Sequence, residues 1–272
     1  MPQVLLTAQD IQIYDGDGFD LFARTGATSA EQIYRAGATG AILGHSEVGD
    51  SPDIVHAKLL TLLARRGSAP DVTILVGETW DEFGQHSSEE IAERVWRHLM
   101  LILKDVPQDR LSLAVIGYEP KWGSRGSGRD DMPPPSPQTI GVVGTRLRAG
   151  LIELLGEDLG KNIPLIYGGR STPERTEEIL QNENIEGLIL GSACNTVEKT
   201  LAIADTMERA RPGKRKILHA NFKAYNLTDT YEAYFEAFRK LDNSFTIYLS
   251  PCVADLREVS KLLLNMVVLE TE

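Results

Sequence analysis

Polar residues that could perform chemistry stand directly after short runs of Val, Ile and Leu. Glu119 follows one such run, where a carboxylate could act as a general base toward a carbon-bound proton. His45 follows another, just before a helix start whose dipole favours neutral imidazole, which can donate a hydrogen bond to a carbonyl. Asn221 and Lys223 would project to the same side of an extended segment and could hold a substrate oxygen and stabilise negative charge. Each residue taken alone also fits a structural role, such as capping the next element or facing solvent.

Two glycine-containing turns could hold a phosphate. Gly169, Arg170 and Ser171 follow one apolar run, and Gly191 and Ser192 follow the next. Backbone N–H groups at such turns and at helix starts can cradle an anion, and barrels often bind phosphate after two late, adjacent strands. Glycine also simply permits a tight turn, so either pair alone is a weak signal.

The elements that must position these residues alternate regularly. Eight apolar runs lack strict polar alternation, as strands covered on both faces do, and recur about every 34 residues. They are Val4–Thr7, Ala41–Gly44, Val72–Gly77, Leu111–Gly117, Ile163–Gly168, Leu188–Gly191, Ile217–Ala220 and Phe245–Leu249. Helical stretches lie between them, several opened by Ser, Thr or Asp caps. These are Ser29–Ala36, Ser51–Arg66, Ser87–Leu103, Pro137–Leu155, Thr172–Gln181, Thr196–Arg211, Thr228–Leu241 and Ala254–Met266.

This alternation predicts an α/β fold. An open doubly wound sheet would use the same order, but the number eight and the chemistry-bearing residues after several different strands favour a closed (β/α)8 barrel. Two segments break the regularity. Gly123–Pro137 is long and Pro-rich, which indicates a functional lid or an exposed insertion, and Arg211–Lys216 is a short basic connector.

Size and composition limit the remaining classes. The 272 residues suit one barrel domain spanning 1–272, because such barrels use about 250 residues around a single core. A net charge of −11 argues against nucleic-acid or anionic-membrane partners, and the N-terminus lacks a signal-peptide pattern, so we expect a soluble cytoplasmic protein. Cys194 and Cys252 form no CxxC pair and the five His residues show no HExxH spacing, so we expect neither metal nor cofactor.

Together these fragments resemble the triosephosphate isomerase family. GHSE at Gly44–Glu47 and YEPKW at Tyr118–Trp122 are the most specific matches. Further matches are Ala8 and Gln9, Gly26, Ala27 and Glu31, Gly77 and Glu78, Tyr167–Gly169, and Asn221 with Lys223. The resemblance spans nearly the whole chain and implies a TIM barrel.

The order of the segments is rearranged relative to that family. The family's opening Asn-x-Lys segment lies here near residue 221, and the chain starts at what resembles the family's third strand. This indicates a circular permutation, which a closed barrel tolerates because its first and last strands are neighbours. The connector Arg211–Lys216 would then join the family's original termini.

The resemblance implies roles for single residues. Glu119 would be the base, His45 the neutral electrophile, and Lys223 and Asn221 the electrostatic partners, with Ser46 and Glu47 in support; this family is itself a standard example of such a Glu base and neutral His. The reaction implied interconverts dihydroxyacetone phosphate and glyceraldehyde 3-phosphate through an enediolate, a step of glycolysis and gluconeogenesis. A homodimer is also implied.

Departures from the family pattern fall on the lid and phosphate segments. The family's WAIGTG reads here as Trp122 to Gly128, one residue longer, with Gly126 as the expected phosphate contact. Its YGGS becomes YGGR at Arg170, which could pair with phosphate bidentately or displace the usual pose. Val48 and Gly49 stand where Arg residues are usual. Two alternatives therefore stay open: an isomerase of a related sugar phosphate such as a tetrulose phosphate, and a noncatalytic metabolite-binding barrel.

Overall fold

The computed structural model describes residues 2–13, 26–64, 69–123, 131–225 and 227–268. Eight parallel strands in this part of the chain close into a barrel in sequence order, β1 pairing with β8. The strands are β1 (Gln3–Ala8), β2 (Gly40–Leu43), β3 (Asp71–Val76), β4 (Ala114–Tyr118), β5 (Leu165–Gly168), β6 (Gly187–Leu190), β7 (Lys216–Asn221) and β8 (Phe245–Ser250). The closed (β/α)8 barrel expected from the sequence is confirmed.

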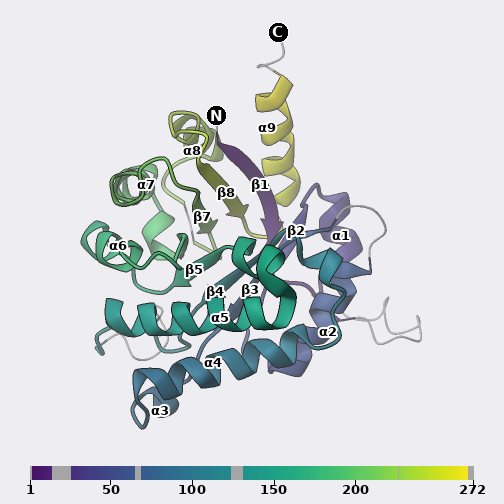
Figure 1. Cartoon of the computed structure of the whole chain (residues 1–272). Coiled ribbons are helices and arrows are strands. Elements are labelled where there is room, and N and C mark those ends of the chain that lie inside the picture. Colours follow the sequence, from purple (N-terminus) through teal and green to yellow (C-terminus); the bar gives the residue numbers. More distant parts are fainter. Residues whose placement is uncertain (1, 14–25, 65–68, 124–130, 226, 269–272) are drawn as a thin grey trace.

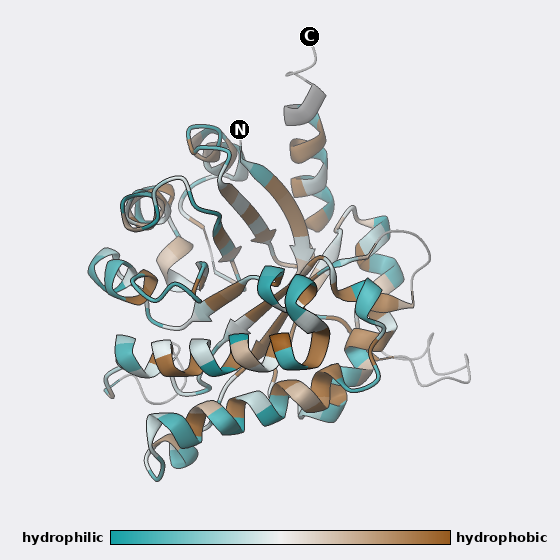
Figure 2. Ribbon diagram, viewed as in Figure 1, coloured by the Kyte–Doolittle hydropathy of each residue, from teal (hydrophilic) through white to brown (hydrophobic). Residues whose placement is uncertain are grey.

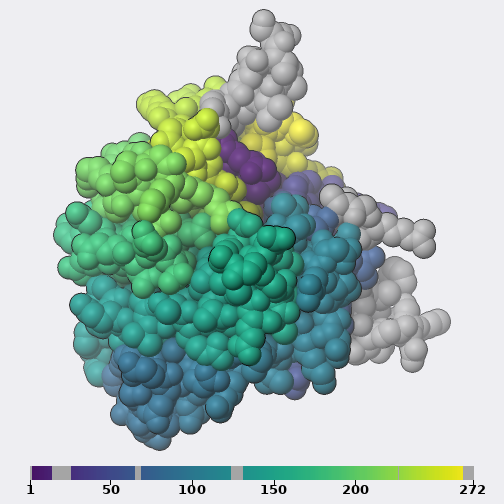
Figure 3. All heavy atoms as spheres, in the orientation of Figure 1, coloured from purple at the N-terminus to yellow at the C-terminus, as the bar shows by residue number. Residues whose placement is uncertain are grey.

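Helices surround the barrel (Figure 1). They are α1 (Ala30–Arg35), α2 (Pro52–Leu63), α3 (Trp80–Phe83), α4 (Ser88–Leu103), α5 (Pro137–Asn162), α6 (Pro173–Leu180), α7 (Val197–Ala210), α8 (Tyr231–Phe238) and α9 (Leu256–Val268), with 3-10 turns η2 (Gln108–Leu111) and η3 (Ser192–Cys194). In Figure 3 the sequence colours follow one another in bands across the visible face, so successive units are spatial neighbours. No helix among the described residues is long and apolar enough to cross a lipid bilayer.

Ser and Thr residues at or directly before the predicted helix starts cap five helices, whereas the start predicted at Thr228 is two residues early, because Thr230 caps α8. Ser51, Ser87, Ser136, Thr172 and Thr196 each accept a hydrogen bond at the side chain from the backbone N–H three residues on. This contact satisfies one of the N–H groups that the first turn of a helix leaves unpaired. The starts of five long helices could therefore be read from local sequence.

Apolar side chains form two layers of core. The inner layer fills the barrel with Ile42, Leu75, Val115, Ile166, Ile189, Ile217 and Tyr248. The outer layer joins the other strand faces to the helices, and Figure 2 shows brown faces of α4 and α5 alternating with teal ones. Both faces of the strands are thus buried, which explains why their sequences lack polar alternation.

Strand and helix limits were predicted less well at three places. Leu111 ends η2 instead of starting a strand, and Ile163 caps α5, because a buried apolar run does not by itself distinguish strand from turn. The predicted end of α5 at Leu155 coincides with a break at Gly156, whose φ of 82° is non-helical, before a second helical piece to Asn162. The short helix α3 was not predicted, although Thr79 and Glu82 form its capping box.

Candidate functional site

The loops after the strands gather the predicted residues at the carboxyl end of the barrel. His45 follows β2, at a turn that requires glycine: Gly44 has φ 78°, and a Cβ there would lie 2.5 Å from the Leu75 carbonyl oxygen. Glycine adopts this conformation without the steric cost that other residues carry. The turn carries His45 into the barrel mouth, where it is 7% exposed.

Glu119 is held by the loop after β2. Its Oε2 accepts from the Ser46 backbone N–H at 2.9 Å, and its Oε1 accepts from the Ser46 hydroxyl at 3.1 Å. The His45 Nε2 lies 3.5 Å from Oε1. Glu119 is 5% exposed, so its carboxylate and the His45 imidazole share one site that is largely shielded from solvent.

The His45 ring has a defined tautomer. The backbone N–H of Glu47 donates to Nδ1 at 3.1 Å. Since Nδ1 accepts a hydrogen bond, it carries no proton, and the neutral ring bears its hydrogen on Nε2. The donor therefore faces Glu119 and the pocket, as the expected electrophilic role requires.

Lys223 and Asn221 come from the end of β7. The Lys223 Nζ forms an ion pair with Glu47 Oε1, and its backbone N–H donates to Asn221 Oδ1 at 3.0 Å. Lys223 has φ 49°, an unusual value for a residue other than glycine. A strained backbone at a charged pocket residue is often maintained for function.

A buried acid braces the segment that carries Glu119. Glu78 accepts from the Tyr118 hydroxyl at 3.1 Å and from the Trp122 ring N–H at 3.0 Å. Burial raises the pKa of Glu78, and these two hydrogen bonds oppose that change. Glu78 thus anchors both sides of Glu119 from the end of β3.

The expected phosphate turns follow β5 and β6. Gly169 has φ 153°, and a Cβ there would lie 2.4 Å from the Tyr167 hydroxyl oxygen. A Cβ on Gly191 would lie 3.1 Å from Lys223 Cε, so the absence of side chains leaves room beside the ammonium. Ser192 opens η3. Gly126 lies outside the described residues.

The Arg170 side chain is hydrogen-bonded to the segment that follows Glu119. Its Nε donates to the Gly123 carbonyl at 3.3 Å, and its Nη2 donates to the Met132 carbonyl. Arg175 donates to the Pro135 carbonyl at 2.9 Å. Arg170, in the turn after β5, and Arg175, on α6, therefore fasten the Pro-rich segment at both ends.

One hollow brings most of the predicted residues together. It is lined by His45, Glu119, Gly168, Gly169, Arg170, Ile189, Gly191, Ser192, Ala193, Asn221, Lys223 and Tyr225. Of the remaining predicted residues, Ser46 and Glu47 contact this set, and Ser171 donates to the Gly169 carbonyl at 3.4 Å. The predicted catalytic side chains thus converge.

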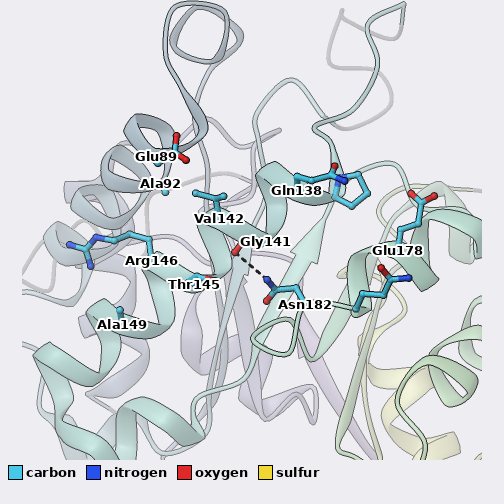
Figure 4. A pocket seen from close by; sticks show the side chains of 12 residues that line it. Glu89, Ala92, Gln138, Gly141, Val142, Thr145, Arg146, Ala149, Glu178 and Asn182 are labelled. Carbon is cyan, nitrogen blue, oxygen red and sulfur yellow. Dashed lines mark hydrogen bonds between the residues drawn. The ribbon is translucent and has the colours of Figure 1, made fainter.

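Figure 4 shows a larger groove elsewhere, on the helical wall. Its labelled residues come from α4, α5 and the region of α6, and Asn182 donates to the Gly141 carbonyl at 3.3 Å. The residues lining it include no His, Lys or Cys. It therefore lacks the acid–base set found at the barrel mouth.

Sequence reasoning did not assign a role to Gln9. Its side-chain amide donates to the carbonyls of Lys223 at 2.8 Å and Ser250 at 3.0 Å. Its position directly after β1 was the available signal, but contacts across more than 200 residues are invisible in sequence. Tyr225 and Ile189, which also line the hollow, were likewise missed.

Comparison with known proteins agrees with this geometry. The family model for triosephosphate isomerase matches residues 2–207. A triosephosphate isomerase of Treponema denticola is 30% identical over 205 residues, covering 74% of this chain and 76% of the relative. One from Granulibacter bethesdensis is 29% identical over 218 residues, covering 75% and 82%, and one from Roseiflexus sp. RS-1 is 30% identical over 206 residues, covering 74% of each. The chain belongs to the triosephosphate isomerase family.

Proposed function

We propose that this protein interconverts dihydroxyacetone phosphate and glyceraldehyde 3-phosphate. The observation that carries the proposal is the contact of Glu119 with His45 beside Lys223 and Asn221 in one hollow. A base, a neutral donor and a cation around one small metabolite are the groups that proton transfer next to a carbonyl needs. The match to the triosephosphate isomerase family model and the name that the relatives share support this proposal.

The groups act in a defined sequence. The Glu119 carboxylate removes the proton from C1 of the ketose, and the C–H electrons form the C1–C2 double bond of an enediolate. The negative charge moves to the substrate O2, where the His45 Nε2–H and the Lys223 ammonium stabilise it. The hydroxyl proton then passes from O1 to O2, which leaves the negative charge on O1, and return of the carbon-bound proton to C2 forms the C1 aldehyde, so the reaction balances without a co-reactant.

Glu119 must change partners during this sequence. Both of its oxygens accept from Ser46. A carboxylate takes up a proton at an oxygen lone pair, and these hydrogen bonds occupy a lone pair on each oxygen. Substrate binding therefore moves Glu119 away from the Ser46 donors and toward the carbon-bound proton.

We propose phosphate binding at the turns after β5 and β6. Gly169, Gly191 and Ser192 line the hollow beside the Lys223 charge, Ser171 places a hydroxyl next to Gly169, and Gly126 belongs to the proposed set. Arg170 lines the hollow too, with its guanidinium hydrogen-bonded to loop carbonyls. Anions bind well where several N–H groups point to one place.

The test is an isomerase assay of the purified full chain with triose and tetrulose phosphates. We expect turnover of triose phosphate, and Glu119→Gln to lower kcat by about 100- to 10,000-fold, the usual contribution of a positioned base. Glu89→Gln on α4 is the matched control and should leave kcat unchanged. Exclusive turnover of the four-carbon substrate would assign the related isomerase instead, and no turnover of either would leave a binding barrel.

We further propose a cytoplasmic homodimer. Val48, Tyr225 and Val253 are 44%, 37% and 57% exposed and follow β2, β7 and β8 at the same end of the barrel. Exposed apolar side chains are the groups that subunit association buries, and these three stand at one end of the barrel. Sedimentation should show a dimer that Val253→Asp dissociates; a monomeric wild-type protein would contradict this.

We also propose that residues 1–272 form one circularly permuted domain. The family match ends at residue 207, whereas β7 and β8 complete the barrel, and β1 packs against the last helix α9. The connector is integrated, since Lys214, Arg215 and Lys216 pair with Glu183, Glu186 and Glu208. A gene reordered to begin at Lys216, with the old ends joined, should fold and keep its activity; failure to fold would oppose the permutation.

A further inference from the structure

Four polar side chains lie inside the barrel beneath the pocket. Thr7, Thr73, His219 and Ser250 come from β1, β3, β7 and β8, and each is 0% exposed. Apolar side chains surround them, and the Tyr248 ring stacks on His219 at 5.3 Å. Burying polar groups is unfavourable unless they are hydrogen-bonded, so the presence of four such side chains in the barrel interior has to be explained.

The cluster is internally satisfied around a neutral imidazole. The His219 Nδ1 lies 3.2 Å from the Thr73 hydroxyl, and Nε2 lies 2.8 Å from the Ser250 hydroxyl, which is 2.7 Å from that of Thr7. A neutral ring has one donor and one acceptor nitrogen, so one of these two hydroxyls donates to the ring and the other accepts from it. Burial lowers the pKa of His219 to about 3, so the ring stays uncharged at neutral pH.

The cluster connects to the pocket through Ser250. His219 and Asn221 share one face of β7, and Ser250 is the register partner of Asn221 on β8. The Ser250 carbonyl accepts from Phe222 N–H and from Gln9 Nε2, both at 3.0 Å. Gln9 in turn holds the Lys223 carbonyl at 2.8 Å.

In this chain of contacts, Lys223 is the residue whose backbone conformation depends on hydrogen bonds with other residues. Its positive φ is strained for a residue other than glycine and persists only where neighbouring contacts impose it. Two side chains impose it here: Asn221 accepts from its N–H, and Gln9 donates to its carbonyl. The position of Ser250 sets the position of Gln9, and His219 holds Ser250.

We propose that His219 is a positioning residue for the isomerase reaction, fixing Ser250 and thereby, through Gln9, the backbone that presents Lys223. This rests on the proposed function, in which Lys223 stabilises the enediolate. His219 itself touches no substrate. Its contribution is to keep the ammonium in one place, which preorganised electrostatic stabilisation requires.

The variants for the test are His219→Leu, His219→Gln, Gln9→Leu and the double variant His219→Leu with Gln9→Leu. Ile217→Val, in the same inner layer, is the matched core control. We expect His219→Leu to lower kcat about tenfold, roughly one hydrogen bond's worth. His219→Gln, whose amide keeps a donor and an acceptor, should retain part of the kcat that His219→Leu loses. The double variant should be no slower than the slower single, because coupled residues are non-additive.

Amide hydrogen exchange supplies a readout that does not depend on activity. Exchange at the Phe222 N–H should accelerate in His219→Leu relative to the slowest core amides, and stay unchanged in Ile217→Val. Unchanged protection with unchanged kcat, or kcat losses that multiply in the double variant, would overturn the positioning role. An inactive wild-type protein would refute the proposed function alone, because the exchange measurement still decides the role of His219.

Discussion

Replacement of Arg170 distinguishes a phosphate ligand from a structural tether. The guanidinium donates to the carbonyls of Gly123 and Met132, one on each side of residues 124–130. Arg170→Ser removes both side-chain bonds and leaves the backbone bond from Arg170 N–H to Gly123, at 3.2 Å, intact. The ends of the segment that follows Glu119 would then lose their common anchor.

The structure sets the expected size of this effect. Arg170 is half-buried, so each of these two side-chain bonds is taken at about 1 kcal/mol, the typical net value of a hydrogen bond in a protein. Their joint loss, about 2 kcal/mol, corresponds to a roughly thirtyfold shift against the anchored arrangement. We expect kcat/KM to fall by about that factor.

The assay compares Arg170→Ser with Arg170→Lys. Lysine keeps the charge but lacks the planar fork that reaches two carbonyls, so we expect both variants to behave alike. Arg35→Ser, at an exposed ion pair on α1, is the matched control. A lysine variant with wild-type kinetics beside a serine variant of raised KM would refute the tether, since charge alone would then suffice.

Three further outcomes follow from the buried and hydrogen-bonded groups. His219 has its folded-state pKa lowered to about 3, so as pH falls from 6.5 toward 3 the unfolded chain binds a proton that the native state does not. Stability should drop by about 1.4 kcal/mol per pH unit from this group, a slope that urea unfolding should show missing in His219→Leu. Lys58 is 2% exposed and forms ion pairs with Asp10 and Asp50. Lys58→Met would leave both carboxylates without a counter-charge, so urea unfolding should show that the free energy of unfolding falls by about 3–5 kcal/mol. A loss below 1 kcal/mol would contradict this. Ser46→Ala removes the hydroxyl bond to Glu119 Oε1 and leaves the backbone bond to Oε2, so kcat should fall about fivefold, roughly one hydrogen bond's worth, whereas an unchanged kcat would show that the backbone N–H alone holds the carboxylate.

The sequence by itself determined the eight repeated units and the placement of chemistry at strand ends. Caps such as Ser87 and Ser136 act on their own helices, so local sequence reveals them. In a parallel barrel every strand ends at the same face, so Glu119, His45 and Lys223 converge once closure is granted. Strand limits such as the start of β4 were less accurate, because Leu111 is buried in a turn as fully as in a strand.

Only the tertiary structure decided which partner each side chain contacts. The hold of Ser46 on Glu119, the donation of Glu47 N–H to His45, and the turn of Arg170 toward backbone carbonyls depend on rotamers and on loops packed together in space. The link from His219 through Gln9 joins strands at opposite ends of the chain. Hydrogen bonds require donor and acceptor within about 3 Å, and strand order specifies position only to the nearest element.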